Sequence, residues 1–375
     1  MSTVLHDDFD AIESAYAEPC ELVFNVQATT ACNFCCKHCM FACHPVAAPK
    51  QEWMSAEDID AALELANDFQ QAGHSVRINI IGGEATLDLD KFGRFIDCLG
   101  NHPGAQSISF EMTTNGWFLR SWPTLCKFAA AVGPLMSNTE MAIRISNSIY
   151  HDPFRSSVEK LIIPSKPDQR NHYSYERKAS RLEAALESPY DYWEFTAACP
   201  NCEAELYEQT CSKCGNEMSE DEYFEAQDKA YMIPGHQWIQ ALLKACKEDR
   251  LYVDSRVSDE TKVSPVGRAA NNGIGIQKVS CWDGTPKFTI SPGGNLQGIC
   301  CTGGKVPIGH VRDGAWKLFA RASFYIHAIE RRFPGENPQR CRSCSAFAVE
   351  WLRSQKPRCE GFLAAEQKEP ALCAA

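Results

Sequence analysis

The stretch ELVFNVQATTACNFCCKHC, residues 21–39, joins the two patterns on which the fold of this chain depends. Its first nine residues are rich in apolar side chains and strand formers, and they predict a β-strand. Its last eight residues include four cysteines, so a cysteine-rich loop follows the strand at once. Three of these cysteines, Cys32, Cys36 and Cys39, have the spacing C-x3-C-x2-C, which leaves Cys35 outside the pattern.

Strands and helices alternate after this loop. Ser55 and Asp58 have the spacing of a capping box and Gly73 is typical of a helix end, so the sequence predicts a helix over 55–73. Further strands are expected at 76–83, 107–116, 141–148 and 251–256. Further helices are expected at 89–100, 123–133, 176–188 and 235–250. This alternation predicts an α/β fold built on a parallel sheet.

Functional groups of such sheets lie on the loops that follow the strands. Four of these loops are notable here: the cysteine loop, GGE (82–84), TTNG (113–116) and SNS (146–148). Because parallel strands end at the same edge of the sheet, we expect the four loops to meet there although they are far apart in sequence.

Composition sets limits on the cellular environment and on the ligands. The chain has 375 residues, enough for two domains or for one large domain with additions. Its formal net charge of −11 disfavours a surface that binds nucleic acid along its whole length. The first ten residues, MSTVLHDDFD, lack the basic start and apolar run of a secretory signal, which predicts a cytoplasmic protein. Its 20 cysteines then predict metal sites rather than disulfides.

Three cysteines on one loop would leave one iron of a four-iron cluster open to a small molecule. The C-x3-C-x2-C loop after the first strand resembles the signature of radical S-adenosylmethionine (radical SAM) enzymes. The resemblance implies a partial parallel (β/α)6 TIM-like barrel over residues 21–270, after an N-terminal extension (1–20). It implies a catalytic 4Fe-4S cluster on Cys32, Cys36 and Cys39, with S-adenosylmethionine on the open iron. It also implies a reductant such as flavodoxin or ferredoxin, and a 5′-deoxyadenosyl radical that abstracts a substrate hydrogen atom.

A structural zinc site is the alternative for this loop. It would need a fourth ligand, to be recruited from Cys35, Cys43, His38 or His44. His38 also departs from the family, which usually has an aromatic residue at that position.

Two glycines and a glutamate after the second strand resemble the family's element that receives the methionine ammonium of the cofactor. They are Gly82, Gly83 and Glu84, followed by Ala85 where relatives commonly have proline. Glycine permits close approach of a ligand to the main chain, and a cation needs an acceptor. A purely structural turn is the alternative interpretation.

Polar residues after the later strands are further candidates for cofactor contacts. Ser146, Asn147 and Arg155 resemble family residues that contact the ribose or carboxylate of S-adenosylmethionine, and Asn115 is a candidate for the pocket wall. Strand-end capping, a solvated arginine and a turn asparagine are the structural alternatives.

A later group of cysteines predicts a second metal centre in residues 271–360, before a tail (361–375). The stretch 265–345 resembles the twitch auxiliary-cluster domain of some radical SAM enzymes, which implies one auxiliary iron–sulfur cluster on Cys281, Cys300, Cys341 and Cys344. The larger SPASM module would need cysteines near Glu350 and Ser354. A structural zinc site is again the alternative. FTISPGGNLQGICC (288–301) predicts a hairpin within this region.

The segment CPNCEAELYEQTCSKCG (199–215) has the spacing CxxC-x8-CxxC. Two such pairs predict a zinc ribbon, inserted at 196–218, with the ligands Cys199, Cys202, Cys211 and Cys214. The insert could stabilise itself or contact a macromolecular substrate.

The substrate is open at this stage. A peptide or protein is one candidate, and a nucleotide, a nucleic-acid base or a small metabolite is the other. Basic and aromatic residues over 155–181 are compatible with nucleic acid, whereas the net charge of −11 argues against binding of an extended duplex. A metal-binding scaffold or electron carrier without radical chemistry is a third possibility.

Overall fold

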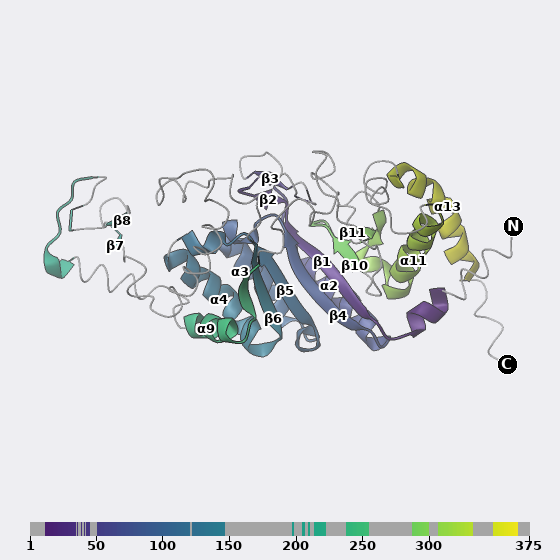
Figure 1. The fold of residues 1–375 in the computed structure, drawn as a ribbon, viewed down its shortest axis with the longest axis horizontal. Helices are drawn as coiled ribbons and strands as arrows, with labels where there is room; N and C mark the ends of the chain where they lie inside the picture. The colour runs from purple at the N-terminus through teal and green to yellow at the C-terminus, as the bar shows by residue number, and fades with distance from the viewer. Residues whose placement is uncertain are drawn as a thin grey trace.

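The fold is described from a computed structural model (Figure 1). The residues it describes are 12–34, 36, 39, 41, 43–45, 51–120, 122–146, 197–198, 205–206, 209–210, 214–222, 238–254, 287–299, 307–332 and 348–366. The predicted helix at 176–188, most of the 196–218 insert and the segment 155–181 lie outside them.

One eight-stranded sheet organises these residues, in the order β12-β11-β10-β1-β4-β5-β6-β9. The strands are β1 (Glu21–Thr29), β4 (Ser75–Gly82), β5 (Ser109–Thr114), β6 (Met141–Ser146), β9 (Leu251–Asp254), β10 (Lys287–Ile290), β11 (Asn295–Ile299) and β12 (Pro307–His310). The run from β10 to β9 is parallel throughout, and β11 and β12 continue it in antiparallel pairing. The predicted α/β class and the mainly parallel sheet are therefore confirmed.

Helices connect and flank the strands. They are α2 (Ala56–Gln71), α3 (Leu89–Asn101), α4 (Trp122–Asn138), α9 (Ile239–Lys247), α11 (Ala315–Arg332) and α13 (Ala348–Glu366). Figure 1 shows α3, α4 and α9 beside the β5–β6 end of the sheet, and α11 and α13 beside β10 and β11. Strands β1, β4, β5 and β6 are neighbours in chain order, so right-handed crossovers bring their connecting helices to one face.

Burial alternates along β4, β5 and β6. Ile78, Ile80, Phe110, Met112 and Ile143 are all buried, while the residues between them are partly exposed. Period-two burial means that one face of the sheet packs on the helices and the other does not. The start of α2 follows the sequence as well, because the Ser55 hydroxyl accepts a hydrogen bond from the Asp58 amide at 3.2 Å.

The predicted hairpin is confirmed as β10 and β11. Its first strand pairs in parallel with β1, and Phe288 packs between Phe24 and Phe69, with ring centroids 5.5 and 5.8 Å away. Phe319 of α11 packs on Phe69 as well, at 6.4 Å. The C-terminal residues thus extend the same sheet and share its core. The proposed 271–360 auxiliary domain remains a prediction, since its four proposed cluster ligands lie outside the described residues.

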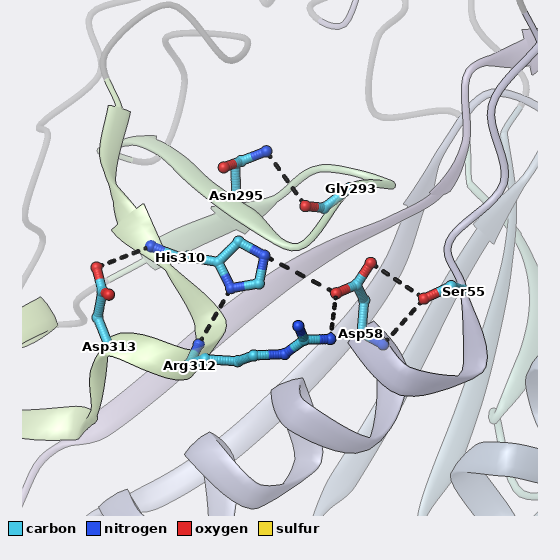
Figure 2. Close-up of polar contacts among 7 residues, drawn as sticks. All are labelled: Ser55, Asp58, Gly293, Asn295, His310, Arg312 and Asp313. Atoms are coloured by element: carbon cyan, nitrogen blue, oxygen red, sulfur yellow. Dashed lines mark hydrogen bonds and ion pairs between the residues drawn. The ribbon is translucent and has the colours of Figure 1, made fainter.

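A polar cluster fastens this extension to the start of α2 (Figure 2). The Asp58 carboxylate lies 3.2 Å from Arg312 Nη2 and 3.8 Å from His310 Nε2. The Asp313 carboxylate accepts a hydrogen bond from the His310 amide at 3.1 Å. Because the Arg312 side chain is 59 % exposed, water screens its ion pair and the aromatic packing contributes more to this junction.

Short elements complete the described chain. They are β2 (Ala31–Cys32), β3 (His44–Pro45), β7 (Ala197–Ala198), β8 (Glu205–Leu206), η1 (Ala85–Leu87), η2 (Ala105–Ser107), η3 (Trp117–Arg120) and η7 (Val311–Asp313). None of the described helices combines the length and the apolar character that a membrane-spanning helix needs.

Candidate functional site

The cysteine loop begins where β1 ends. Cys32 lies in β2, which pairs in parallel with β3 and so brings the two ends of the loop together. Figure 1 shows β2 and β3 side by side above the ends of the parallel strands. Within the loop, the Cys39 amide donates a hydrogen bond to the Cys36 carbonyl at 3.2 Å, and the Phe34 amide donates to Cys32 Sγ at 3.3 Å. An amide donor to sulfur favours the thiolate that a metal would bind.

The structure brings another cysteine to this loop. Cys43 is 2 % exposed, and its thiol forms a hydrogen bond with that of Cys39. This hydrogen bond, burial and the nearby charges of Cys39 and Cys32 raise the pKa of Cys43, while a hydrogen bond from Gln27 opposes the rise. The sequence pointed to Cys43 only as a possible zinc ligand. Cys35 and His38 lie outside the described residues.

The described cysteine sulfurs of the loop are not arranged around a common point as metal ligands would be. Within the described part of the chain, no three Cys, His, Asp or Glu side chains are gathered so that they could hold a metal ion as they stand. The fit of the loop to an iron–sulfur cluster therefore rests on its ligand types and on the groups that surround it. Three thiols on a short loop are ligands of the kind that iron–sulfur clusters take.

The two glycines of GGE lie against the base of this loop. The Gly83 amide donates to the Thr29 carbonyl at 2.8 Å, and the Glu84 amide donates to the Ala31 carbonyl at 2.7 Å. A Cβ on Gly83 would lie 1.7 Å from the Ala31 carbonyl oxygen. Gly82 has a φ of 118°, a conformation that favours glycine. Backbone packing at Gly83 and backbone conformation at Gly82 therefore explain why both positions are glycine, whether or not a ligand also binds there.

This close approach makes a stability prediction. Gly83→Ala should lower the free energy of unfolding by about 3 kcal/mol or more, because the ends of β1 and β4 must separate to admit the methyl group. Gly100→Ala is the matched control: its Cβ would lie 3.7 Å from Leu135, and alanine in a helix gains up to about 1 kcal/mol over glycine. Urea unfolding of the two variants measures the difference, and equal stabilities would contradict the packing described here.

Glu84 connects three segments of the rim. Its carboxylate is 2 % exposed and accepts hydrogen bonds from the Thr86 amide at 3.1 Å, the Thr114 hydroxyl at 2.7 Å and the Asn115 amide. Burial raises the pKa of Glu84, and these hydrogen bonds moderate the rise. No cationic side chain of the described residues pairs with this carboxylate. A buried acid without a cation is a natural partner for a positively charged ligand.

Asn115 extends the contacts to the cysteine loop. Its side-chain amide donates to Asn33 Oδ1 at 2.8 Å, and Asn33 directly follows Cys32. The side-chain nitrogen of Asn33, Nδ2, is buried and has no hydrogen-bond partner among the described atoms. An unused buried donor beside the cysteines suits a ligand with acceptor atoms, such as sulfide or a carboxylate. The cysteine loop, GGE and TTNG therefore meet, as the strand–loop pattern predicts.

Asn33 and Thr114 were not predicted as site residues, although both adjoin residues that were. Ser146 ends β6 and is partly exposed, while Asn147 and Arg155 lie outside the described residues. The contacts proposed for these three residues remain predictions.

A charged cluster lies on the face of the sheet opposite the buried strand residues. Arg144 of β6 forms ion pairs with Glu111 of β5 and, at 3.3 Å, with Asp254 of β9. Its Nε also donates to the Tyr252 hydroxyl at 3.0 Å. All three charged side chains are at most 25 % exposed, so water screens their interactions only in part. This cluster was not predicted, although the alternating polar residues in 107–116 and 141–148 indicate a polar face of the sheet.

The same face is polar nearer the centre of the sheet. Asn79 donates to Asn25 Oδ1 at 3.1 Å across β1 and β4. The side-chain oxygen of Asn79, Oδ1, is buried and has no hydrogen-bond partner among the described atoms. This face thus offers charged groups and a buried acceptor on the strands whose ends carry the cysteine loop, GGE and TTNG.

The remaining cysteines divide into two groups. Cys281, Cys300, Cys341 and Cys344, together with Cys199, Cys202 and Cys211, lie outside the described residues. Cys214 is exposed in a turn. Cys126 and Cys359 are buried thiols in helices, and burial raises the pKa of each to about 12, which makes them poor ligands and nucleophiles.

Comparisons with known proteins found likeness in solved structures, while no family model and no curated protein matches the chain. BtrN in complex with AdoMet and 2-DOIA matches 86 % of this chain and 91 % of its own, with 10 % identity and a TM-score of 0.41. Native anSMEcpe with bound AdoMet matches 93 % and 100 %, with 14 % identity and a TM-score of 0.38. Streptococcus suis SuiB bound to precursor peptide SuiA matches 90 % and 74 %, with 13 % identity and a TM-score of 0.35.

Proposed function

We propose that the chain is a radical SAM enzyme with its catalytic 4Fe-4S cluster on Cys32, Cys36 and Cys39. One observation carries this proposal: the three-cysteine loop, GGE and Asn115 meet through hydrogen bonds where β1, β4 and β5 end. A three-thiolate loop beside a buried carboxylate suits a cluster that binds an amino-acid-like cofactor on its open iron. When bound, the cluster and S-adenosylmethionine supply reductive cleavage of the sulfonium and, through a 5′-deoxyadenosyl radical, hydrogen-atom abstraction.

The chain's own residues bind and orient this cofactor. The Glu84 carboxylate, which has no cation partner among the described residues, accepts the methionine ammonium. Gly82 and Gly83 hold the Glu84 main chain against the base of the cysteine loop. Asn115 fixes Asn33 through one hydrogen bond, which leaves the buried Asn33 amide to donate to the bound group. Ser146, Asn147 and Arg155 complete the proposed contacts.

The test is anaerobic reconstitution with iron and sulfide, followed by dithionite and S-adenosylmethionine. We expect 5′-deoxyadenosine, detected by liquid chromatography and mass spectrometry, in amounts that depend on both reductant and cluster. A scaffold or an electron carrier would bind iron and yield none of this product. An intact cluster that leaves S-adenosylmethionine uncleaved would therefore overturn the proposal.

We propose further that the substrate is a peptide or protein. On β5, β6 and β9 the polar face carries two acids, Glu111 and Asp254, around one base, Arg144. This excess of acid repels a phosphate backbone and suits the amides and cationic side chains of a polypeptide. A nucleic-acid substrate would instead give salt-sensitive retention of oligonucleotides, and such retention would count against a peptide.

Two more metal sites belong to this proposal. Cys281, Cys300, Cys341 and Cys344 would hold an auxiliary iron–sulfur cluster, and Cys199, Cys202, Cys211 and Cys214 would hold zinc. Metal analysis of the reconstituted protein tests both, since iron should exceed the content of one four-iron cluster and zinc should accompany it.

A further inference from the structure

We propose that Cys43 is a fourth ligand of the catalytic cluster: it binds the open iron until S-adenosylmethionine displaces it. This inference rests on the proposed function, because it concerns the iron that Cys32, Cys36 and Cys39 leave free. It adds a resting state in which the chain itself protects the reactive corner.

The backbone places Cys43 beside the other three cysteines. Ala31 pairs with His44 and Cys32 with Pro45 in the parallel β2–β3 ladder, so the loop closes on itself next to Cys43. The Cys43 and Cys39 thiols are in hydrogen-bond contact. The spacing C-x3-C-x2-C-x3-C thus puts four cysteines on one short loop, and the inference requires their side chains to turn toward a common cluster when it binds.

A buried amide supports Cys43 from β1. Gln27 is 8 % exposed, and its Nε2 lies 3.7 Å from Cys43 Sγ as a hydrogen-bond donor. Gly82 makes room for this side chain, since a Cβ there would lie 2.5 Å from Gln27 Cγ. The amide stabilises a thiolate whether or not that thiolate is bound to iron. Gln27 and Gly82 therefore fix the position of the Cys43 sulfur beside the end of β1.

The exchange is a ligand substitution without a change in oxidation state. With the cluster bound, the Cys43 thiolate would give up its bond to the iron, and the amino and carboxylate groups of S-adenosylmethionine would take its place. The released thiolate keeps the hydrogen bond from Gln27 or takes a proton from solvent. Because Cys43 competes for the iron, the apparent affinity for S-adenosylmethionine equals the intrinsic affinity multiplied by the fraction of clusters that are open.

Mössbauer spectroscopy of the reconstituted full-length chain tests this inference. In the wild type without cofactor, we expect the irons of the catalytic cluster to have similar, thiolate-ligated environments. S-adenosylmethionine should then produce one distinct iron with a higher isomer shift. In Cys43→Ala this distinct iron should be present from the start, and Cys126→Ala, which changes a buried thiol of α4, should behave as the wild type.

Two further measurements use the same samples. Mild ferricyanide oxidation removes an open iron and leaves a three-iron cluster with its own electron paramagnetic resonance signal. We expect this signal to form much faster in Cys43→Ala than in the wild type. If Cys43 occupies the iron in nine clusters of ten, Cys43→Ala should bind S-adenosylmethionine about tenfold more tightly.

The outcomes separate this inference from the proposed function. A wild type that already shows a distinct iron without cofactor, and oxidises as fast as Cys43→Ala, would overturn the role of Cys43 and leave the radical function standing. A protein that binds zinc on the four sulfurs and forms no iron–sulfur cluster there would overturn both.

Discussion

Cys36→Ala should reduce the yield of 5′-deoxyadenosine by more than about 100-fold. Mutation of residues that only support metal ligands already lowers activity or metal affinity by about 10- to 100-fold, and loss of a ligand itself should cost more. Cys36 is 7 % exposed and lies in the middle of the three-cysteine pattern, where its sulfur would bind one corner of the cluster. Without it, the corner of the cluster that Cys36 would close loses its own thiolate, whether or not Cys43 binds another corner. The measurement is product formation by the reconstituted variant, together with its iron content.

Cys35→Ala provides the matched control. It removes a thiol from the adjacent position, outside the C-x3-C-x2-C spacing, and should retain most of the product and of the iron. If Cys35→Ala lost the cluster and Cys36→Ala kept it, the assignment of ligands would be wrong. If both variants bound zinc as the wild type does, the loop would be a structural zinc site.

Glu84→Ala should have the second largest effect, on both stability and cofactor binding. It leaves the buried Thr86 amide, Thr114 hydroxyl and Asn115 amide without their acceptor, at a cost of about 2–4 kcal/mol in unfolding free energy. It should also weaken S-adenosylmethionine binding by about 30-fold or more, because loss of a buried charge pair costs at least about 2 kcal/mol. Urea unfolding and calorimetric titration measure the two effects.

Glu84→Gln removes the negative charge of the side chain but keeps its shape. The effect of the charge can then be measured from the pH dependence of stability. Burial raises the pKa of Glu84 above its ordinary value of 4.5, so the folded protein holds this proton more tightly than the unfolded chain does. The contribution of Glu84 to stability is therefore greatest below pH 4.5 and falls as pH rises through the folded pKa. Glu84→Gln lacks this dependence, so the stability of the wild type relative to the variant should fall with rising pH. A constant difference would contradict the raised pKa.

Local patterns in the sequence were sufficient for the first half of the fold. The strand predicted at 21–29 is β1, and the helix predicted at 55–73 is α2 with Ser55 as its cap. Both depend on neighbours in sequence, on apolar period and on capping chemistry. The meeting of the cysteine loop, GGE and TTNG followed from the rule that parallel strands end at one edge.

Contacts between distant residues could not be predicted in this way. The parallel pairing of β10 with β1 joins residues about 260 positions apart, and the hairpin pattern at 288–301 does not name a partner strand. The Arg144 cluster likewise depends on the register of β5, β6 and β9. The position of Cys43 against Cys39 depends on the closure of β2 on β3, two strands of two residues each.

The pairing of β10 with β1 has a consequence for synthesis of the chain on the ribosome. Strand β1, which leads into the cysteine loop, emerges about 260 residues before β10, one of its two neighbours in the sheet, which begins at Lys287. Until then one side of β1 has unpaired backbone amides and carbonyls, and Phe24 lacks its contact with Phe288. The strand that leads into the cysteine loop therefore gains its second neighbour only after β10 has been synthesised. Iron delivered earlier would reach a loop whose supporting strand is paired on one side only.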